Sequence, residues 1–306
     1  MTLTYARLLY VVIANPGYTE VNPDHKERTA GQEKIPQHQR PGLQEFIKRD
    51  LFICQGDGQP IWCSQCQNWK PDRTHHCREV DRCVHKMDHF CPWVGGVVSE
   101  TSFKFFVQFV AYTAIYCTFV LILVAVLLHE YVKAYHKIHV HWVVTLAMAA
   151  LFGLFTVGMT GSSLQFALVN TTTIENLSRK TVVYQLAIHL PRPPQERPPF
   201  PTISFPVTQP TAYTDIAGHG LKTFAILHSR PGDNPWDLGA FGNFKSVMGE
   251  QWYDWLLPLK YSPCTKHDRC CGPEDETRSG YRAIGGKASS QKKTTTKTKT
   301  ISATGR

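Results

Sequence analysis

The chain has 306 residues, enough for one or two domains, and a formal net charge of +9 that favours anionic partners such as a membrane surface or nucleic acid. Its 10 cysteines are too few for a disulfide-stapled scaffold. Five of them crowd, with histidines between them, into one window that is typical of a metal site in a reducing compartment: Cys63, Cys66, Cys77, Cys83 and Cys91.

The first 60 residues precede that window. Residues 1–15 contain the apolar run Leu8–Ala14, which is shorter than the roughly 20 residues that span a bilayer and lacks the features of a signal peptide. A frayed N-terminus would explain it, but we favour the end of a membrane helix whose beginning is missing. Residues 16–60 are polar and predict a cytosolic lead-in, in which Gln44–Ile53 can form a short helix.

Residues 61–102 form the cysteine-rich segment. Cys63 and Cys66 make a C-x2-C knuckle, and His76 and Cys83 follow at distances that a small β-ribbon can bring back to it. Three thiolates and one imidazole complete a tetrahedral zinc site of the structural kind, with no open position for a substrate. His75 could replace His76 in this set.

The same segment contains Asp88, His89 and Cys91 within four residues. A thiol attacks carbonyls as the thiolate, and a neighbouring imidazole lowers its pKa. The spacing predicts Cys91 as nucleophile, His89 as base and Asp88 as the carboxylate that orients the imidazole.

Two long apolar blocks follow, the first uncharged from Phe105 to Leu128 and the second uncharged from Trp142. Residues 103–128 and 142–166 predict transmembrane helices, because an uncharged run of this length is rare in soluble folds. The connection 129–141 contains four histidines and is expected to be lumenal, since lysines and arginines are concentrated on both outer flanks. The expected fold is an α-helical integral membrane protein with a cytosolic, small-β zinc ribbon between membrane helices.

The C-terminal region, 167–286, is expected to be cytosolic. Pro191–Pro210 is proline-rich and predicts extended or disordered chain. The aromatic residues of Asn234–Pro258 fit either the membrane interface or packing under the cytosolic domain. Residues 287–306 predict a disordered basic tail.

These features together resemble the DHHC palmitoyltransferases, membrane enzymes that acylate protein cysteines from palmitoyl-CoA. The resemblance covers residues 61–180 and includes Pro71, Arg73, Cys77, Met87, Pro92 and Trp93 beside the residues named above. Thr172, Thr173 and Glu175 match the family's Thr-Thr-x-Glu motif and imply a supporting role at the site. Asn234, Pro235, Gly239 and Asn243 resemble a later Asn-Pro segment.

The chain also departs from the family pattern. Phe90 replaces the second histidine of the central motif, and Val80 and Val97 replace two cysteines. The lost positions resemble ligands of one of the family's two zinc ions, of which Cys77 alone survives. We therefore expect one zinc ion, with the three apolar residues packed together, as in a fungal subgroup with a degenerate cysteine-rich domain. Family members usually have four membrane helices, so the chain resembles an N-terminally shortened member.

The resemblance implies S-palmitoylation through an acyl-enzyme on Cys91, with palmitoyl-CoA and cysteine-containing proteins as substrates at the cytosolic membrane face. Arg78, Arg82 and Lys104 could attract the phosphates of CoA or simply reflect the positive-inside rule. The alternative is a catalytically inactive membrane adaptor that holds a partner on its zinc ribbon. A nucleic-acid binder is disfavoured, because ribbon aromatics and a basic recognition helix are missing.

Overall fold

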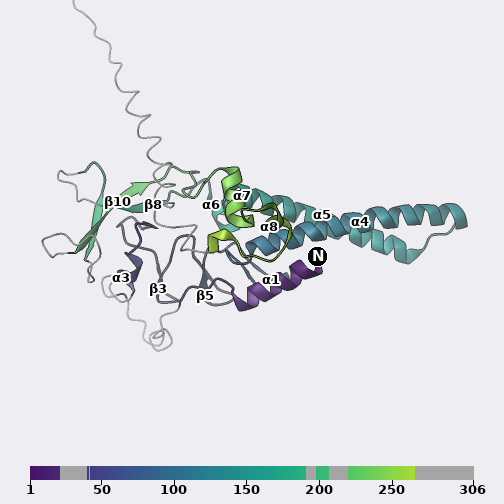
Figure 1. Cartoon of the computed structure of the whole chain (residues 1–306), viewed down its shortest axis with the longest axis horizontal. Coiled ribbons are helices and arrows are strands. Elements are labelled where there is room, and N and C mark those ends of the chain that lie inside the picture. The colour runs from purple at the N-terminus through teal and green to yellow at the C-terminus, as the bar shows by residue number, and fades with distance from the viewer. Residues whose placement is uncertain (21–39, 41, 191–197, 207–219, 266–306) are drawn as a thin grey trace, which may run out of the picture.

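The computed structural model describes residues 1–20, 40, 42–190, 198–206 and 220–265. Two long helices project from a body of short strands and helices, and the N-terminal helix lies beside their base (Figure 1). The predicted tail, 287–306, lies outside the described residues.

The projecting pair is α4 (Phe103–Tyr135) and α5 (Val140–Val169). Both are long and apolar enough to cross a membrane, and only 17% of the most apolar part of each is buried inside the protein. Both extend beyond the predicted bounds, so most of the expected connection 129–141 is helical. The reason is that the predicted bounds follow the hydrophobic run, whereas Glu130, Lys133 and their neighbours continue the helix until His136 adopts a left-handed conformation, with φ of 53°.

The cysteine-rich segment folds into three two-stranded hairpins, which is the small β structure expected. They are β2 (Trp62–Cys63) with β3 (Asn68–Trp69), β4 (His75–Cys77) with β5 (Arg82–Val84), and β6 (His89–Cys91) with β7 (Gly96–Val98). His76 lies opposite Cys83 in the second hairpin, and Phe90 lies opposite Val97 in the third. The registers therefore set residues of like chemistry face to face.

A four-stranded antiparallel sheet joins the lead-in to the C-terminal region. Its order is β1-β8-β10-β9, with bounds Leu51–Ile53, Gln185–His189, Leu221–His228 and Thr202–Pro206 respectively. The helix expected within Gln44–Ile53 is wrong beyond Phe46, where α3 (Leu43–Phe46) ends. Phe52 is fully buried against Phe224 at 5.1 Å between ring centroids, and this long-range contact favours a strand. Part of the expected extended stretch, Pro191–Pro210, is the strand β9.

Short helices gather at the base of α4 and α5. They are α1 (Thr2–Ala14), α6 (Thr173–Ser178), α7 (Ala240–Met248) and α8 (Trp252–Leu256). Gln108 of α4 donates through Nε2 to the carbonyls of Asp254, Trp255 and Leu257 at 3.0–3.3 Å. The aromatic segment predicted within Asn234–Pro258 therefore packs on the first turns of α4.

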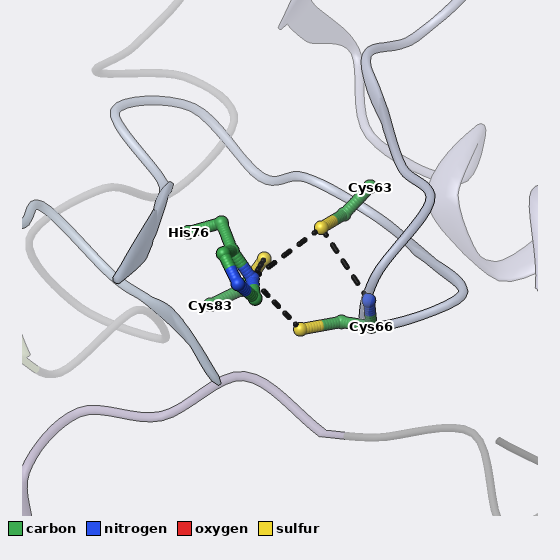
Figure 2. Close-up of side chains that lie close together, drawn as sticks. All are labelled: Cys63, Cys66, His76 and Cys83. Atoms are coloured by element: carbon green, nitrogen blue, oxygen red, sulfur yellow. Dashed lines mark hydrogen bonds between the residues drawn. The ribbon is translucent and has the colours of Figure 1, made fainter. Parts of the chain in front are cut away.

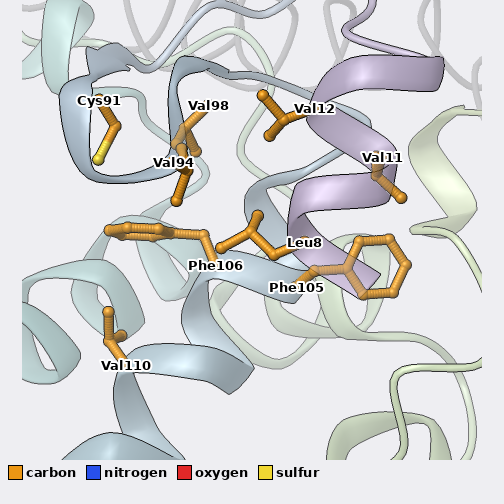
Figure 3. Packing of buried hydrophobic residues seen from close by; sticks show 9 residues of the cluster. All are labelled: Leu8, Val11, Val12, Cys91, Val94, Val98, Phe105, Phe106 and Val110. Carbon is orange, nitrogen blue, oxygen red and sulfur yellow. The ribbon is translucent and has the colours of Figure 1, made fainter. Parts of the chain in front are cut away.

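Helix α1 packs against the third hairpin and α4. Leu8 and Val11 are fully buried beside Phe105 and Phe106 (Figure 3). A Cβ on Gly96 would collide with the side chain of Val12, so the close approach of α1 to β7 requires glycine at this position.

Candidate active site and metal centre

Cys91 ends strand β6 and begins a short 3-10 turn, η2 (Pro92–Val94). Gly95 closes the turn with φ of 65°, which returns the chain into β7. The side chain of Cys91 lies beside Val94 and faces the ring of Phe106, and Val110 of the same cluster lies beyond that ring (Figure 3). The thiol therefore borders the apolar surface of the helices.

Asp88 and His89 form the hydrogen bond that the sequence predicts. Nδ1 of His89 lies 2.7 Å from Oδ2 of Asp88, which is 4% exposed. Thr173 donates to the same carboxylate twice, from its backbone N–H to Oδ1 at 2.8 Å and from Oγ1 to Oδ2 at 2.9 Å. Because both carboxylate oxygens are held, Asp88 presents a fixed acceptor to the imidazole, whose Nε2 is left for Cys91.

His89 and Cys91 change each other's proton affinity. Burial alone would lower the pKa of His89, but its hydrogen bonds with Asp88 and Cys91 outweigh burial and raise the pKa to about 9. Burial alone would raise the pKa of Cys91, but the hydrogen bond with His89 and the backbone N–H groups of Val94 and Trp93 lower it below its ordinary value. The pair therefore stabilises the imidazolium of His89 and raises the thiolate fraction of Cys91 above that of an isolated thiol.

The Thr-Thr-x-Glu residues connect this pair to the rest of the body. Thr172 caps α6: its Oγ1 accepts from the N–H of Glu175 at 3.2 Å, and Glu175 Oε2 accepts from the N–H of Thr172 at 2.9 Å. Both oxygens of Glu175 also accept from Arg73 at 2.6 Å. Burial alone would raise the pKa of Glu175, but Arg73 more than compensates and lowers it. Capping and the ion pair together fix the start of α6, where Thr173 meets Asp88.

Sequence reasoning missed Asn170, the polar residue at the C-terminal end of α5 that contacts the partners of α6. Asn170 accepts through Oδ1 from Arg73 Nη1 at 2.9 Å and from Lys86 Nζ at 3.0 Å, and it donates to the carbonyl of Trp236 at 2.8 Å. The buried side chain of Arg73 and the half-buried Lys86 thus face the C-terminal end of α5, where the helix dipole is negative. Arg73 was part of the family pattern, but nothing local to it indicates a partner 102 residues away.

The predicted metal ligands converge on one point (Figure 2). One donor atom from each of Cys63, Cys66, His76 and Cys83 lies within 4.8 Å of every other, so the set could hold a metal ion. Nδ1 of His76 is 3.7, 3.3 and 4.0 Å from the three sulfurs, close to the roughly 3.5 Å between nitrogen and sulfur in a tetrahedral zinc site. Its Nε2 lies 3.4 Å from Asp81, the kind of second contact that orients a ligating imidazole.

His75 takes no part in this cluster. Its side chain instead lines a cavity of about 300 Å³ between the cysteine-rich segment and strand β8, beside Lys70, Tyr184 and Trp236. Because neighbouring strand residues point to opposite faces, His75 and His76 of β4 could not both face the same sulfurs. The geometry therefore favours His76 over the alternative left open by the sequence.

The remaining cysteine-rich positions form an apolar cluster. Cys77 and Val97 are buried in it, and Val80 and Phe90 pack against them, together with Val84, Met87 and Ile174. The expected packing of the three substituted positions is confirmed. Among the described residues, the only group of three or more cysteine, histidine or acidic side chains gathered closely enough for a metal is the cluster around His76.

Two other expectations change. Lys104 is fully buried, so it is unsuited to attract a soluble phosphate. Arg82 is engaged on the ring of Tyr18 at 5.0 Å and donates to the carbonyl of Thr19 at 3.1 Å. Burial and local contacts, which a count of basic residues does not see, account for both.

Residues 57–180 match the family model described as DHHC palmitoyltransferase. The chain belongs to this family. It is 52% identical over 235 residues to palmitoyltransferase pfa5 of Aspergillus fumigatus, covering 74% of this chain and 53% of that protein. It is 46% identical over 263 residues to palmitoyltransferase pfa5 of Emericella nidulans, with the same coverage.

A more distant relative is human palmitoyltransferase ZDHHC15, 26% identical over 273 residues, or 87% of this chain and 67% of that protein. This DHHC protein therefore spans about half the length of the fungal pfa5 relatives it matches. Its family and its two long apolar helices make it a membrane protein.

Proposed function

We propose that this DHHC protein is a protein S-palmitoyltransferase, which transfers palmitoyl from palmitoyl-CoA to protein cysteines through a thioester on Cys91. The observation that carries the proposal is the Asp88–His89–Cys91 arrangement. It places a hydrogen-bonded imidazole beside a thiol with a lowered pKa. The relatives' names, palmitoyltransferase pfa5 and ZDHHC15, support the choice of acyl group.

In the first step the Cys91 thiolate attacks the thioester carbonyl of palmitoyl-CoA and forms a new carbon–sulfur bond. The bond to the sulfur of CoA breaks, and the departing thiolate takes the proton held by His89. In the second step the neutral His89 removes the proton of an acceptor cysteine, whose sulfur attacks the acyl-enzyme and releases Cys91. Asp88, fixed by Thr173, stabilises the imidazolium in both steps.

The position of Cys91 suits a substrate that is half lipid. A palmitoyl chain has about 15 methylene and methyl groups, and leaving them in water costs about 0.8 kcal/mol each. Cys91 belongs to one apolar cluster with Val94, Phe106 and Val110, and the last two residues are part of α4. The acyl chain can then lie along the membrane helices while CoA remains in water. We place the cysteine-rich segment on the cytosolic side, because lysines and arginines are concentrated on the two outer flanks of the helix pair and the connection has only two lysines.

Zinc suits the metal cluster best, since three thiolates and one imidazole are the ligands of closed structural sites. One ion would hold the first two hairpins together, while Thr172, Thr173 and Glu175 support the site from α6. Nucleic acid is not among the expected partners. These are the bilayer, palmitoyl-CoA and cysteine-containing proteins at the cytosolic face.

The test is incubation of the purified chain with labelled palmitoyl-CoA. Wild type should take up label that hydroxylamine removes, and Cys91→Ser should take up none. Cys264 is buried, while Cys270 and Cys271 lie outside the described residues, so both proteins are compared in a background with these three cysteines replaced. Equal label in both would sink the covalent mechanism. A folded wild type without label would favour the inactive adaptor, for which the loss of a histidine at Phe90 is the motivating observation.

A further inference from the structure

Arg7 is the only charged residue of helix α1. Its guanidinium carbon lies 5.5, 5.4 and 5.1 Å from the ring centroids of Tyr10, Phe105 and Tyr261. These rings come from α1, from the first turn of α4 and from the segment after α8. Three separate parts of the chain therefore form an aromatic collar around one cation.

The collar leaves the hydrogen-bonding capacity of Arg7 unused. Nε is buried and has no hydrogen-bond partner within the part of the chain that the structure describes, where no carboxylate pairs with Arg7 either. Ring faces attract the charge but provide no strong acceptor for the five N–H groups of a guanidinium. The guanidinium therefore has N–H groups that could donate to an anion.

A neighbouring cation provides the contrast. Lys260 precedes Tyr261 in the chain, yet its Nζ lies 3.5 Å from Oδ1 of Asp254 and 5.1 Å from the ring centroid of Tyr253. Its charge is therefore met by a carboxylate of the same segment. Arg7 and Lys260 both lie near Tyr261, but among the described residues only Arg7 lacks a carboxylate partner.

The depth of Arg7 indicates which anion is near. Phe105 is the third residue of α4, so the collar lies where the membrane helix begins. Tyr10, on the outer side of the collar, is 58% exposed. Tyrosines and basic residues are enriched at this level of a bilayer, where the anions are lipid phosphates. A guanidinium can bind two phosphate oxygens at once.

We propose that Arg7 and its aromatic collar form a binding site for the phosphate of an anionic phospholipid in the leaflet at which α4 begins. The lipid would seat α1 against α4 and the C-terminal segment, because the three rings come from these three elements. This site is separate from the Asp88–His89–Cys91 group, so it stands or falls independently of the proposed acyl transfer.

The experiment titrates dihexanoyl phosphatidylserine into the full-length protein in detergent and follows the midpoint of thermal unfolding. Arg7→Gln should weaken the apparent affinity about fivefold, the effect of one basic residue at a membrane surface. Lys260→Gln is the matched control: it removes the same charge from the same region but from a paired cation, and should change the affinity less than twofold. Each variant is compared with its own lipid-free midpoint, which cancels differences in basal stability.

Arg7→Lys covers the case in which Arg7→Gln does not fold. It keeps the charge over the rings but loses the fork, so it should bind the lipid more weakly than wild type and more strongly than Arg7→Gln. Equal loss in Arg7→Gln and Lys260→Gln, or wild-type affinity in both Arg7 variants, would overturn the proposal. Inorganic phosphate is the second arm, and stabilisation by it as large as that by the lipid would refute the assignment to a phospholipid.

Discussion

Two clusters back to back hold the cysteine-rich segment, and they use opposite chemistry. One contains the ligand set around His76, and the other is the apolar cluster of Cys77, Val80, Phe90 and Val97. The β4–β5 hairpin separates the two clusters, because its neighbouring residues His76 and Cys77 point to opposite faces. The comparison teaches that the two faces of one hairpin can be packed by different chemistry, a cysteine and histidine group that could hold a metal on one face and apolar side chains on the other.

The largest effect is expected where the comparison is broken at the metal. Cys63→Ala should abolish metal binding and unfold the first two hairpins. In small zinc domains, zinc binding contributes about 10–16 kcal/mol to the free energy of folding, which equals or exceeds the whole free energy of unfolding of most domains. Elemental analysis and limited proteolysis measure the two effects. Cys54→Ala is the control, since Cys54 is a buried thiol outside the cluster and should keep its metal. Two zinc ions per wild-type chain would contradict the single-site proposal.

The apolar half should respond to lost volume instead. Val97 is fully buried opposite Phe90, so Val97→Ala removes two buried carbons and leaves a cavity. The free energy of unfolding should fall by about 2 kcal/mol, whatever the zinc concentration. Val183→Ala, at a position that is 41% exposed, should change it by less than about 0.5 kcal/mol. Denaturant unfolding with and without added zinc makes the measurement, and a zinc-dependent loss at Val97 would show that the two halves are not separate.

A third test concerns His89 and Cys91, the reactive pair on either side of Phe90, and asks whether His89 activates the thiol. In His89→Ala, burial would remain and the hydrogen bond that lowers the pKa of Cys91 would be gone. The pKa of Cys91 should therefore rise, and alkylation by iodoacetamide at pH 7 should slow by on the order of tenfold. His75→Ala, which lies outside the pair, should label at the wild-type rate. Equal rates in all three proteins would mean that His89 does not activate the thiol.

Linkage adds a sign to this test. The pKa of His89 in the folded protein is raised to about 9, above its ordinary 6.5. The stability that the imidazolium contributes is therefore fully present below pH 6.5 and is lost as the pH rises through about 9. His89→Ala should remove this alkaline loss from the pH dependence of unfolding.

The sequence predicts what is written in short spacings. The knuckle at Cys63 and Cys66 and the Asp-His-x-Cys order need only local chain geometry, and the structure brings each set together. The pairing of Arg73 with Glu175 and the burial of Lys104 depend on contacts between distant segments, which no local period encodes. The sequence does not predict strand β1 for the same reason, because its three residues pair with β8, more than 130 positions later. Helix ends fail differently, because apolar runs mark bilayer thickness and not hydrogen bonding.

The smallest effect should follow from the one ligand-type residue left in the apolar half. Cys77 is 1% exposed, and its Sγ donates to Glu79 at 3.0 Å. Burial, the first cause, and the Glu79 carboxylate both raise the pKa of this thiol, so it stays protonated and behaves as a small apolar group. Cys77→Ala should therefore cost about 1 kcal/mol in unfolding free energy and leave the metal content unchanged. Damage equal to that of Cys63→Ala would contradict the contrast between the halves.

The same residue allows the comparison to be reversed. Phe90→His alone should bind no second ion, because Val80 and Val97 still provide no donor atoms. Replacing all three together, as Val80→Cys, Phe90→His and Val97→Cys, gives Cys77 the partners of a three-thiolate, one-imidazole site. When both proteins are free of metal, this variant should be less stable than wild type, since the apolar packing is gone. Elemental analysis of the variant with zinc should find a second zinc ion. Its stability should then depend on zinc in both halves. A triple variant that folds without the second ion would show that the backbone of the apolar half no longer matches a metal site.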